Sequence, residues 1–187
     1  RNSGKGWVTA EYGMLPRSTN TRIDREAAKG KQSGRTQEIQ RLIGRSLRSV
    51  VILENLGERQ IKIDCDVIQA DGGTRTASIS GGFVALYQAI NLLKNNYNIQ
   101  KPIIKEFIGA VSAGIINEQA NLDLDYKEDA DAQVDANFVI CESGKIAEIQ
   151  VTGEEYFFSE DQFKQIFDLS KNGIAQIIKK QKAILNI

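Results

Sequence analysis

The pattern of apolar and polar positions predicts three long helices. In residues 36–57 apolar side chains recur every three or four positions, as on one face of a helix. Thr36 is a suitable N-cap for this helix and Gly57 a suitable end. Residues 77–95 form a second, mostly apolar helix. Residues 159–185 form a third, which begins at a capping serine and could be broken near Gly173.

Other segments have the composition or the alternation of β-strands. In residues 61–67 apolar side chains alternate with charged ones, which predicts a half-buried strand, and residues 7–12 are also strand-like. Four later segments are separated by polar turns and predict an antiparallel meander: residues 107–116, 122–126, 137–141 and 146–151. This order of helices and strands makes the predicted fold class α+β.

Length and composition limit the kind of protein. The 187 residues suffice for one domain with a sizeable core, and we expect a single domain over residues 1–187. No apolar run approaches the ~20 residues that span a bilayer, so no membrane partner is expected. The absence of histidine excludes imidazole bases, Ser-His-Asp triads and most zinc sites. Cys65 and Cys141 lie in apolar segments and are expected to be buried free thiols in a reducing compartment.

Charge is distributed unevenly along the chain although the net charge is zero. Residues 1–49 contain 11 Lys/Arg and 4 Asp/Glu, whereas the remainder contains 13 and 20. This asymmetry suggests one surface for a polyanion and another for a cation such as a metal. Two ordinary solvated surfaces of opposite charge explain the charges equally well.

A strand-to-helix turn at Gly72-Gly73-Thr74-Arg75 is the clearest candidate for chemistry. Two glycines permit a tight turn, and hydroxyl groups and a guanidinium follow at the start of the helix. The N-terminal end of a helix offers N–H groups and a partial positive charge. The turn therefore predicts a site for phosphate or a similar anion. Further along, Gly81-Gly82 predicts close packing against a neighbouring element.

Six carboxylates lie within thirteen residues between two of the predicted strands: Asp123, Asp125, Glu128, Asp129, Asp131 and Asp135. Clustered carboxylates repel one another unless a cation or solvent relieves them, and Mg²⁺ and Mn²⁺ prefer oxygen ligands. At the end of one strand and the start of the next, Asp129 and Asp135 could face the same cleft. A solvated acidic turn is the alternative interpretation.

Arginines are frequent in an irregular segment that ends near Arg35. It contains Arg17, Arg22 and Arg25, with a short helix expected at Arg25–Lys29. Such arginines suit contacts with nucleic-acid phosphates, although surface charge or salt bridges between subunits would also account for them. The anion turn, the carboxylates and the basic segment together indicate phosphoryl-transfer chemistry, which needs no imidazole.

These motifs together resemble those of bacterial ribonuclease PH, the phosphate-dependent tRNA nucleotidyltransferases. The matching segments are residues 6–17, 25–35, 64–67 and 71–78, Glu128-Asp129 with Asp135, Gly173-Ile174 and 181–183. They extend over essentially the whole chain, and in combination they are highly specific.

The resemblance implies an α+β fold, a ribonuclease PH-like β-α-β-α domain (ribosomal protein S5 domain 2-like). It also implies a cytoplasmic homohexamer built as a trimer of dimers. In the family several strands precede the first matching motif, so the domain is expected to be N-terminally incomplete, without those strands.

For function, the resemblance implies a phosphorolytic 3′→5′ exoribonuclease that trims tRNA 3′ ends and acts in rRNA processing. Inorganic phosphate is its co-substrate, nucleoside 5′-diphosphates are its products, and the reverse reaction adds nucleotides. By position, Arg35, Gly73, Thr74 and Arg75 would bind phosphate. The acidic pair Asp129 and Asp135 would be catalytic and hold Mg²⁺ or Mn²⁺, and Arg17, Arg22 and Arg25 would bind tRNA.

Two other functions are compatible with parts of the sequence. One is a catalytically inactive RNA-binding or ring-forming subunit or truncated fragment, but inactive members typically lose the acidic pair or the phosphate arginine. This chain keeps Asp129, Asp135 and Arg75, which favours the enzyme. The other is a small-molecule phosphotransferase, which would have little use for several arginines on one loop.

Overall fold

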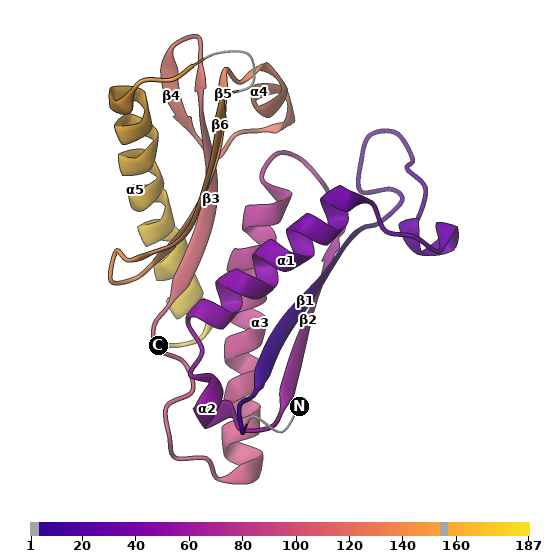
Figure 1. The fold of residues 1–187 in the computed structure, drawn as a ribbon, viewed down its shortest axis with the longest axis vertical. Helices are drawn as coiled ribbons and strands as arrows, with labels where there is room; N and C mark the ends of the chain where they lie inside the picture. Colours follow the sequence, from indigo (N-terminus) through magenta and orange to yellow (C-terminus); the bar gives the residue numbers. More distant parts are fainter. Residues whose placement is uncertain (1–3, 154–156) are drawn as a thin grey trace. The chain divides into compact units, whose positions relative to one another are not determined.

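The structure is a computed structural model that describes residues 4–153 and 157–187 (Figure 1). The described residues form two compact units. Unit 1 comprises the described residues up to Ala70 together with Gly81–Phe107, and unit 2 comprises Asp71–Ser80 together with Ile108–Ile187. The single domain expected over residues 1–187 stays a prediction.

Unit 1 is built on a two-stranded parallel sheet of β1 (Trp7–Met14) and β2 (Gln60–Val67). Parallel strands need a crossover between them, and here helix α1 (Gly34–Ser49) provides it and packs against β1 (Figure 1). The apolar face of α1 is buried: Ile39, Leu42, Ile43 and Leu47 are at most 1% exposed. The connections contain the short 3-10 helix η1 (Glu26–Lys29), as predicted, and helix α2 (Leu53–Leu56).

The single helix predicted over residues 36–57 is wrong, because the segment contains two helices. Helix α1 begins earlier, with Ser33 as its N-cap, whose hydroxyl accepts the Thr36 N–H at 3.2 Å. Gly57, with a φ of 66°, ends the separate helix α2. The break follows Val50, which is buried along with Val51, so the apolar pattern continues across it.

Unit 2 contains a four-stranded antiparallel sheet in the order β4-β3-β5-β6. The strands are β3 (Ile108–Ile116), β4 (Gln119–Leu122), β5 (Val134–Cys141) and β6 (Ile146–Gly153). Helix α5 (Glu160–Ile184) covers one face of this sheet (Figure 1). There Phe138 of β5 lies 6.2 Å from Phe163 and 5.7 Å from Phe167, between ring centroids.

The predicted meander needs a correction at residues 122–126. Strand β4 ends at Leu122, and Tyr126 begins the short helix α4 (Tyr126–Asp131) instead of ending a strand. The strand that follows α4 pairs with β3 and not with β4, so the sheet is not a simple meander. Helix α5 starts after Ser159, as predicted, and passes Gly173 without a break. Gly173 is instead where α5 approaches Leu122, since a Cβ there would lie 2.8 Å from that side chain.

Helix α3 (Thr74–Tyr97) begins three residues before the predicted start. A Cβ on Gly82 would lie 3.4 Å from Ile63 and 3.5 Å from Leu47, so the close packing predicted for Gly81-Gly82 is right for Gly82. It is wrong for Gly81, which faces open space.

Both cysteines are free thiols, as predicted, but Cys65 and Cys141 are half-buried rather than buried. In the part of the chain that the structure describes, no helix is both long and apolar enough to cross a membrane.

Candidate active site

The glycine turn of unit 2 leads directly into helix α3. Gly73 has a φ of 66°, a conformation that favours glycine. Its carbonyl accepts the Ala77 N–H at 2.9 Å and the Thr76 hydroxyl at 2.8 Å, which ties the turn to the helix. Thr74 and Arg75 therefore occupy the first turn of a long helix, where the helix dipole favours an anion.

Arg75 lies over the face of the sheet opposite α5. Its Nη1 donates to Gln150 Oε1 at 3.5 Å. Gln150 is paired with Asn137, which is paired with Ser112, and paired residues share a face of an antiparallel sheet. Since Phe138 faces α5, its neighbour Asn137 faces the other way.

Asp135 lies on the same face as the Arg75 contact. It is two residues from Asn137 on β5 and is paired with Gly114 and Thr152. Asp135 is half-buried, whereas Asn137 beside it is only 6% exposed. The predicted anion turn and one of the two predicted catalytic carboxylates are thus brought to one surface of unit 2.

The structural element that contains Asp129 differs from the one predicted from the sequence. Asp129 is an exposed residue of helix α4 and not the end of a strand. The N-terminal end of α4 lies directly against the glycine turn, because a Cβ on Gly72 would overlap the Leu124 carbonyl oxygen. Asp71 Oδ1 also accepts both the Gly72 N–H at 3.0 Å and the Tyr126 N–H at 2.7 Å.

The acidic cluster is divided by the fold. Asp125 is the N-cap of α4 and accepts the Lys127 and Glu128 N–H groups, each at 2.8 Å, while the Glu128 carboxylate accepts the Asp125 N–H at 2.9 Å. These two carboxylates form a capping box, so helix capping explains part of the acidic pattern. Among residues 4–153 and 157–187, no three Cys, Asp or Glu side chains converge as a metal site.

The acidic pair nevertheless has suitable chemistry for magnesium. Mg²⁺ is commonly bound through one or two carboxylates, with water and substrate phosphate filling the other positions. Asp129 and Asp135 would supply two such oxygen donors, and neither belongs to the capping box.

Ser112 was missed by the sequence reasoning. Its side chain is 2% exposed, and in the described part of the chain its Oγ has no hydrogen-bond partner. The Oγ lies 3.3 Å from the position of a Cβ on Gly73, immediately beneath the turn. A polar residue on a strand as apolar as Ile108–Ile116 was the available signal.

In unit 1 two of the predicted arginines line a single cavity. The cavity has a volume of about 750 Å³, and Arg25 and Arg35 both line it. Arg17 and Arg22 are exposed and are not among its described lining residues. Arg22 lies 3.5 Å from Asp24, which the ammonium of a neighbouring lysine also approaches. Arg35 and the glycine turn belong to different units, so their joint binding of phosphate stays a prediction.

Glu26 fixes the beginning of the helix that contains Arg35. Its carboxylate accepts the Ser33 N–H at 3.3 Å and the Thr36 hydroxyl at 3.0 Å. Hydrogen bonds from Ser33, and then from Thr36, hold the pKa of Glu26 below its usual value. Glu26 thus fastens η1 to the N-terminal end of α1 next to Arg35.

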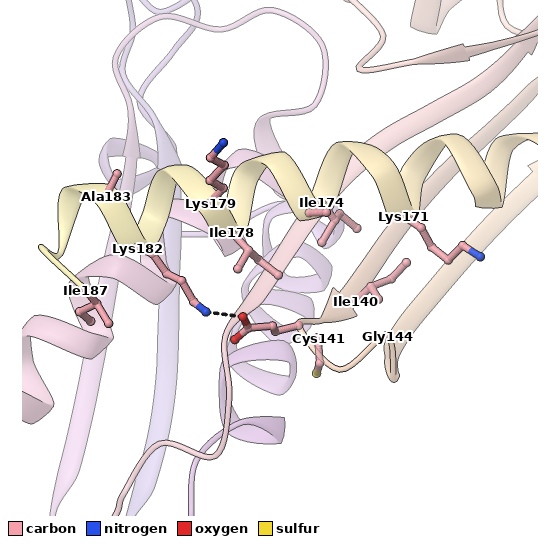
Figure 2. Close-up of a pocket in the computed structure, with 12 residues that line it drawn as sticks. Ile140, Cys141, Gly144, Lys171, Ile174, Ile178, Lys179, Lys182, Ala183 and Ile187 are labelled. Atoms are coloured by element: carbon pink, nitrogen blue, oxygen red, sulfur yellow. Dashed lines mark hydrogen bonds and ion pairs between the residues drawn. The ribbon is translucent and has the colours of Figure 1, made fainter.

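Unit 2 also contains a cavity of about 600 Å³ between α5 and the end of β5 (Figure 2). Its lining is largely aliphatic, including Ile140, Ile174 and Ile178, and lysines of α5 surround it. Lys182 and Glu142, which both line the cavity, form an ion pair (Figure 2). None of the predicted site residues lines this cavity, so it is separate from the candidate active site.

Comparison with known proteins defines first the class of enzyme. Residues 1–90 match the 3′ exoribonuclease family, domain 1, and residues 106–173 match the 3′ exoribonuclease family, domain 2. Ribonuclease PH from Rhodospirillum rubrum is 58% identical over 185 residues, which cover 99% of this chain and 77% of the relative. The chain is therefore an enzyme of the phosphate-dependent 3′ exoribonuclease class. It belongs to the ribonuclease PH family, as its motifs predicted.

Solved structures share the fold. Rice Rrp46 matches with a TM-score of 0.75 at 16% identity, over 99% of this chain and 75% of that one. The Archaeoglobus fulgidus exosome with RNA bound to the active site matches with a TM-score of 0.75 at 17% identity, over 95% and 71%. An archaeal exosome core gives a TM-score of 0.69 at 17% identity, over 96% and 70%. These likenesses confirm the predicted ribonuclease PH-like α+β fold.

Proposed function

We propose that this protein trims tRNA 3′ ends by phosphorolysis. Inorganic phosphate is the nucleophile, nucleoside 5′-diphosphates are the products, and the reverse reaction adds nucleotides to RNA. The observation that supports this most directly is within unit 2. The anion turn with Arg75, the half-buried Asp135 and the N-terminal end of α4 lie on one side of the sheet.

In the proposed reaction a phosphate oxygen attacks the phosphorus of the last phosphodiester bond. The bond between that phosphorus and the 3′ oxygen of the preceding nucleotide breaks, and this oxygen takes up a proton. The attacking phosphate becomes the β-phosphate of the released diphosphate. Gly73, Thr74 and Arg75 would bind the phosphate through the helix N-terminus and the guanidinium fork, with Arg35 as a further cation.

Asp129 and Asp135 would hold Mg²⁺, or Mn²⁺, close to the reacting phosphates. A bound divalent ion offsets the negative charge that develops on the phosphoryl oxygens. The carboxylate of Asp135 is well placed for this, since it is on the sheet face over which Arg75 lies.

Arg17, Arg22 and Arg25 would bind the RNA backbone, because guanidinium groups pair well with phosphates. Arg25 lines the cavity of unit 1, whereas Arg17 and Arg22 are exposed to solvent. We further propose a cytoplasmic homohexamer, a trimer of dimers. Ring assembly is supported by the likeness to exosome chains, one of which has RNA bound to the active site.

The test is incubation of the protein with tRNA that carries extra 3′ residues, in the presence of Mg²⁺ and phosphate. Nucleoside 5′-diphosphates are the expected products, identified by chromatography and mass. Release of monophosphates, or equal activity without phosphate, would contradict the phosphorolytic mechanism. RNA binding without any turnover would support the alternative, an inactive RNA-binding subunit.

A further inference from the structure

We propose that Asp71 is a positioning residue that holds the phosphate-binding turn and helix α4 in one arrangement. Through Asp71, the turn that contains Arg75 and the helix that contains Asp129 would keep a fixed distance from each other. The inference rests on the proposed function, because it names the residue that aligns two parts of the proposed site.

The first observation is a shared acceptor. Asp71 Oδ1 accepts the Gly72 N–H at 3.0 Å and the Tyr126 N–H at 2.7 Å. The first bond belongs to the turn, and the second belongs to the first residue of α4. One oxygen atom therefore links two segments that are 55 positions apart in the sequence.

The second observation is the closeness of these two segments. A Cβ on Gly72 would overlap the Leu124 carbonyl oxygen and lie 2.8 Å from the Asp125 carbonyl carbon. The backbone of the turn therefore lies directly on the backbone that leads into α4. A sideways shift of either segment would change the distance between the anion turn and the acidic helix.

The third observation is that burial of its own side chains does not fix the place of α4. It is six residues long and has no buried residue, so core packing does not hold it. Its own capping box satisfies N–H groups within the helix but does not connect it to a neighbour. The backbone on either side of α4 is hydrogen-bonded to β3, since the Asp123 N–H donates to Ser112 O at 2.7 Å and the Gln133 N–H donates to Ile115 O at 2.8 Å. Among the described residues, Asp71 adds the side-chain link between α4 and the turn.

Substitutions of Asp71 can separate the effect of its hydrogen-bond acceptor from the effect of its charge. Asp71 is exposed, so its two bonds are expected to contribute little to global stability. An asparagine keeps the acceptor oxygen and loses the charge, whereas an alanine loses both. If Asp71 acts by positioning, asparagine should replace it and alanine should not.

The experiment compares wild-type protein with Asp71→Ala and Asp71→Asn, and uses Asp161→Ala, an exposed aspartate in the first turn of α5, as the matched control. For each protein we would measure kcat and KM for phosphate, the Kd of inorganic phosphate by calorimetry, Tm, and amide exchange at residues 72 and 126.

For Asp71→Ala we expect kcat/KM for phosphate to fall about tenfold to a hundredfold, as for a misplacement near 1 Å. Phosphate affinity should fall as well, and both amides should exchange faster at an almost unchanged Tm. The asparagine variant and the control should stay close to wild type.

Three results would overturn the inference. Unchanged phosphate kinetics in Asp71→Ala would remove any positioning role. Equal losses in both Asp71 variants would assign the effect to charge. A lower Tm with normal kinetics of the folded protein would leave only a structural role. If wild-type protein lacks phosphorolysis, the proposed function fails, and phosphate affinity with amide exchange still decides the role of Asp71.

Discussion

The Arg75 guanidinium donates from Nη1 to the side-chain oxygen of Gln150 at 3.5 Å. This long hydrogen bond connects the first turn of α3 to strand β6 and directs the arginine over the sheet face that contains Asp135. An arginine in the first turn of a helix strengthens the positive potential that the helix dipole already provides. The contact therefore brings the anion turn to the same sheet face as Asp135, a carboxylate 60 residues further along the chain.

Replacing Arg75 should weaken the use of phosphate. For Arg75→Ala we expect kcat/KM for phosphate to fall by roughly thirtyfold, the equivalent of about 2 kcal/mol for hydrogen bonds to a charged group. Arg75→Lys should be intermediate, because an ammonium lacks the planar fork. Initial rates at varied phosphate concentration measure both. Arg41→Ala, at an exposed position of α1, is the control, and an unaffected kcat/KM for phosphate in Arg75→Ala would remove this residue from the phosphate site.

Asp135→Asn should abolish turnover while RNA binding is largely retained. The substitution keeps the size of the side chain and removes the charge that a divalent ion requires. Single-turnover assays at several Mg²⁺ concentrations, together with a filter-binding assay for RNA, separate the two effects. Full activity of the variant would show that the metal assignment is wrong, whereas Asp161→Asn should behave as wild type.

Arg25→Ala should reduce the salt dependence of RNA binding. Each phosphate contact with single-stranded RNA contributes about 0.7 to the slope of log K against log salt concentration. The slope should therefore decrease by about that amount, with a uniform loss of affinity across RNA sequences. Binding titrations at four or more salt concentrations measure it. Arg41→Ala again serves as control, and an unchanged slope for Arg25→Ala would remove Arg25 from the RNA surface.

Most of the fold could be predicted because its strongest patterns are local. Alternation in residues 61–67 gave β2, and the serine at position 159 marked the start of α5. The failures occurred where tertiary packing decides. Val50 and Val51 are buried across the break between α1 and α2, so apolar spacing could not reveal it. Strand pairing across α4 also depends on contacts that are distant in the sequence.

The candidate site was predictable in its residue types but not in its geometry. The glycine turn has a local signature, and its place at the start of a helix was predicted correctly. The role of Asp125 as a helix cap makes part of the acidic cluster structural, which composition alone could not distinguish from metal binding. Ser112 and Asp71 could not be identified from the sequence, because their contacts with the turn and with α4 exist only in the folded chain.

Gly81→Ala should stabilise the protein. Gly81 is in the interior of α3, and a Cβ there would meet no atom within 4 Å. Alanine is favoured over glycine in a helix by about 0.5–1 kcal/mol. Chemical denaturation should show this gain. Gly114→Ala is the contrasting variant, since its Cβ would overlap the Val134 carbonyl oxygen, and it should be destabilised. A loss of stability in Gly81→Ala would contradict the open space at that position.

Glu26→Gln should lower stability at neutral pH and have no such effect in acid. Hydrogen bonds from Ser33 and Thr36 hold the folded-state pKa of Glu26 below its ordinary value of 4.5. A carboxyl group whose pKa is depressed by folding stabilises the folded state above its unfolded pKa, and this contribution is lost as the pH falls through the folded-state pKa. The difference in urea midpoint between wild type and Glu26→Gln should therefore be constant from pH 7 to about pH 5, and should shrink progressively below pH 4.5. Glu118→Gln, at an exposed position outside α1, is the control. A difference for Glu26→Gln that persists undiminished at pH 3 would show that the carboxylate charge is not what fastens η1 to α1.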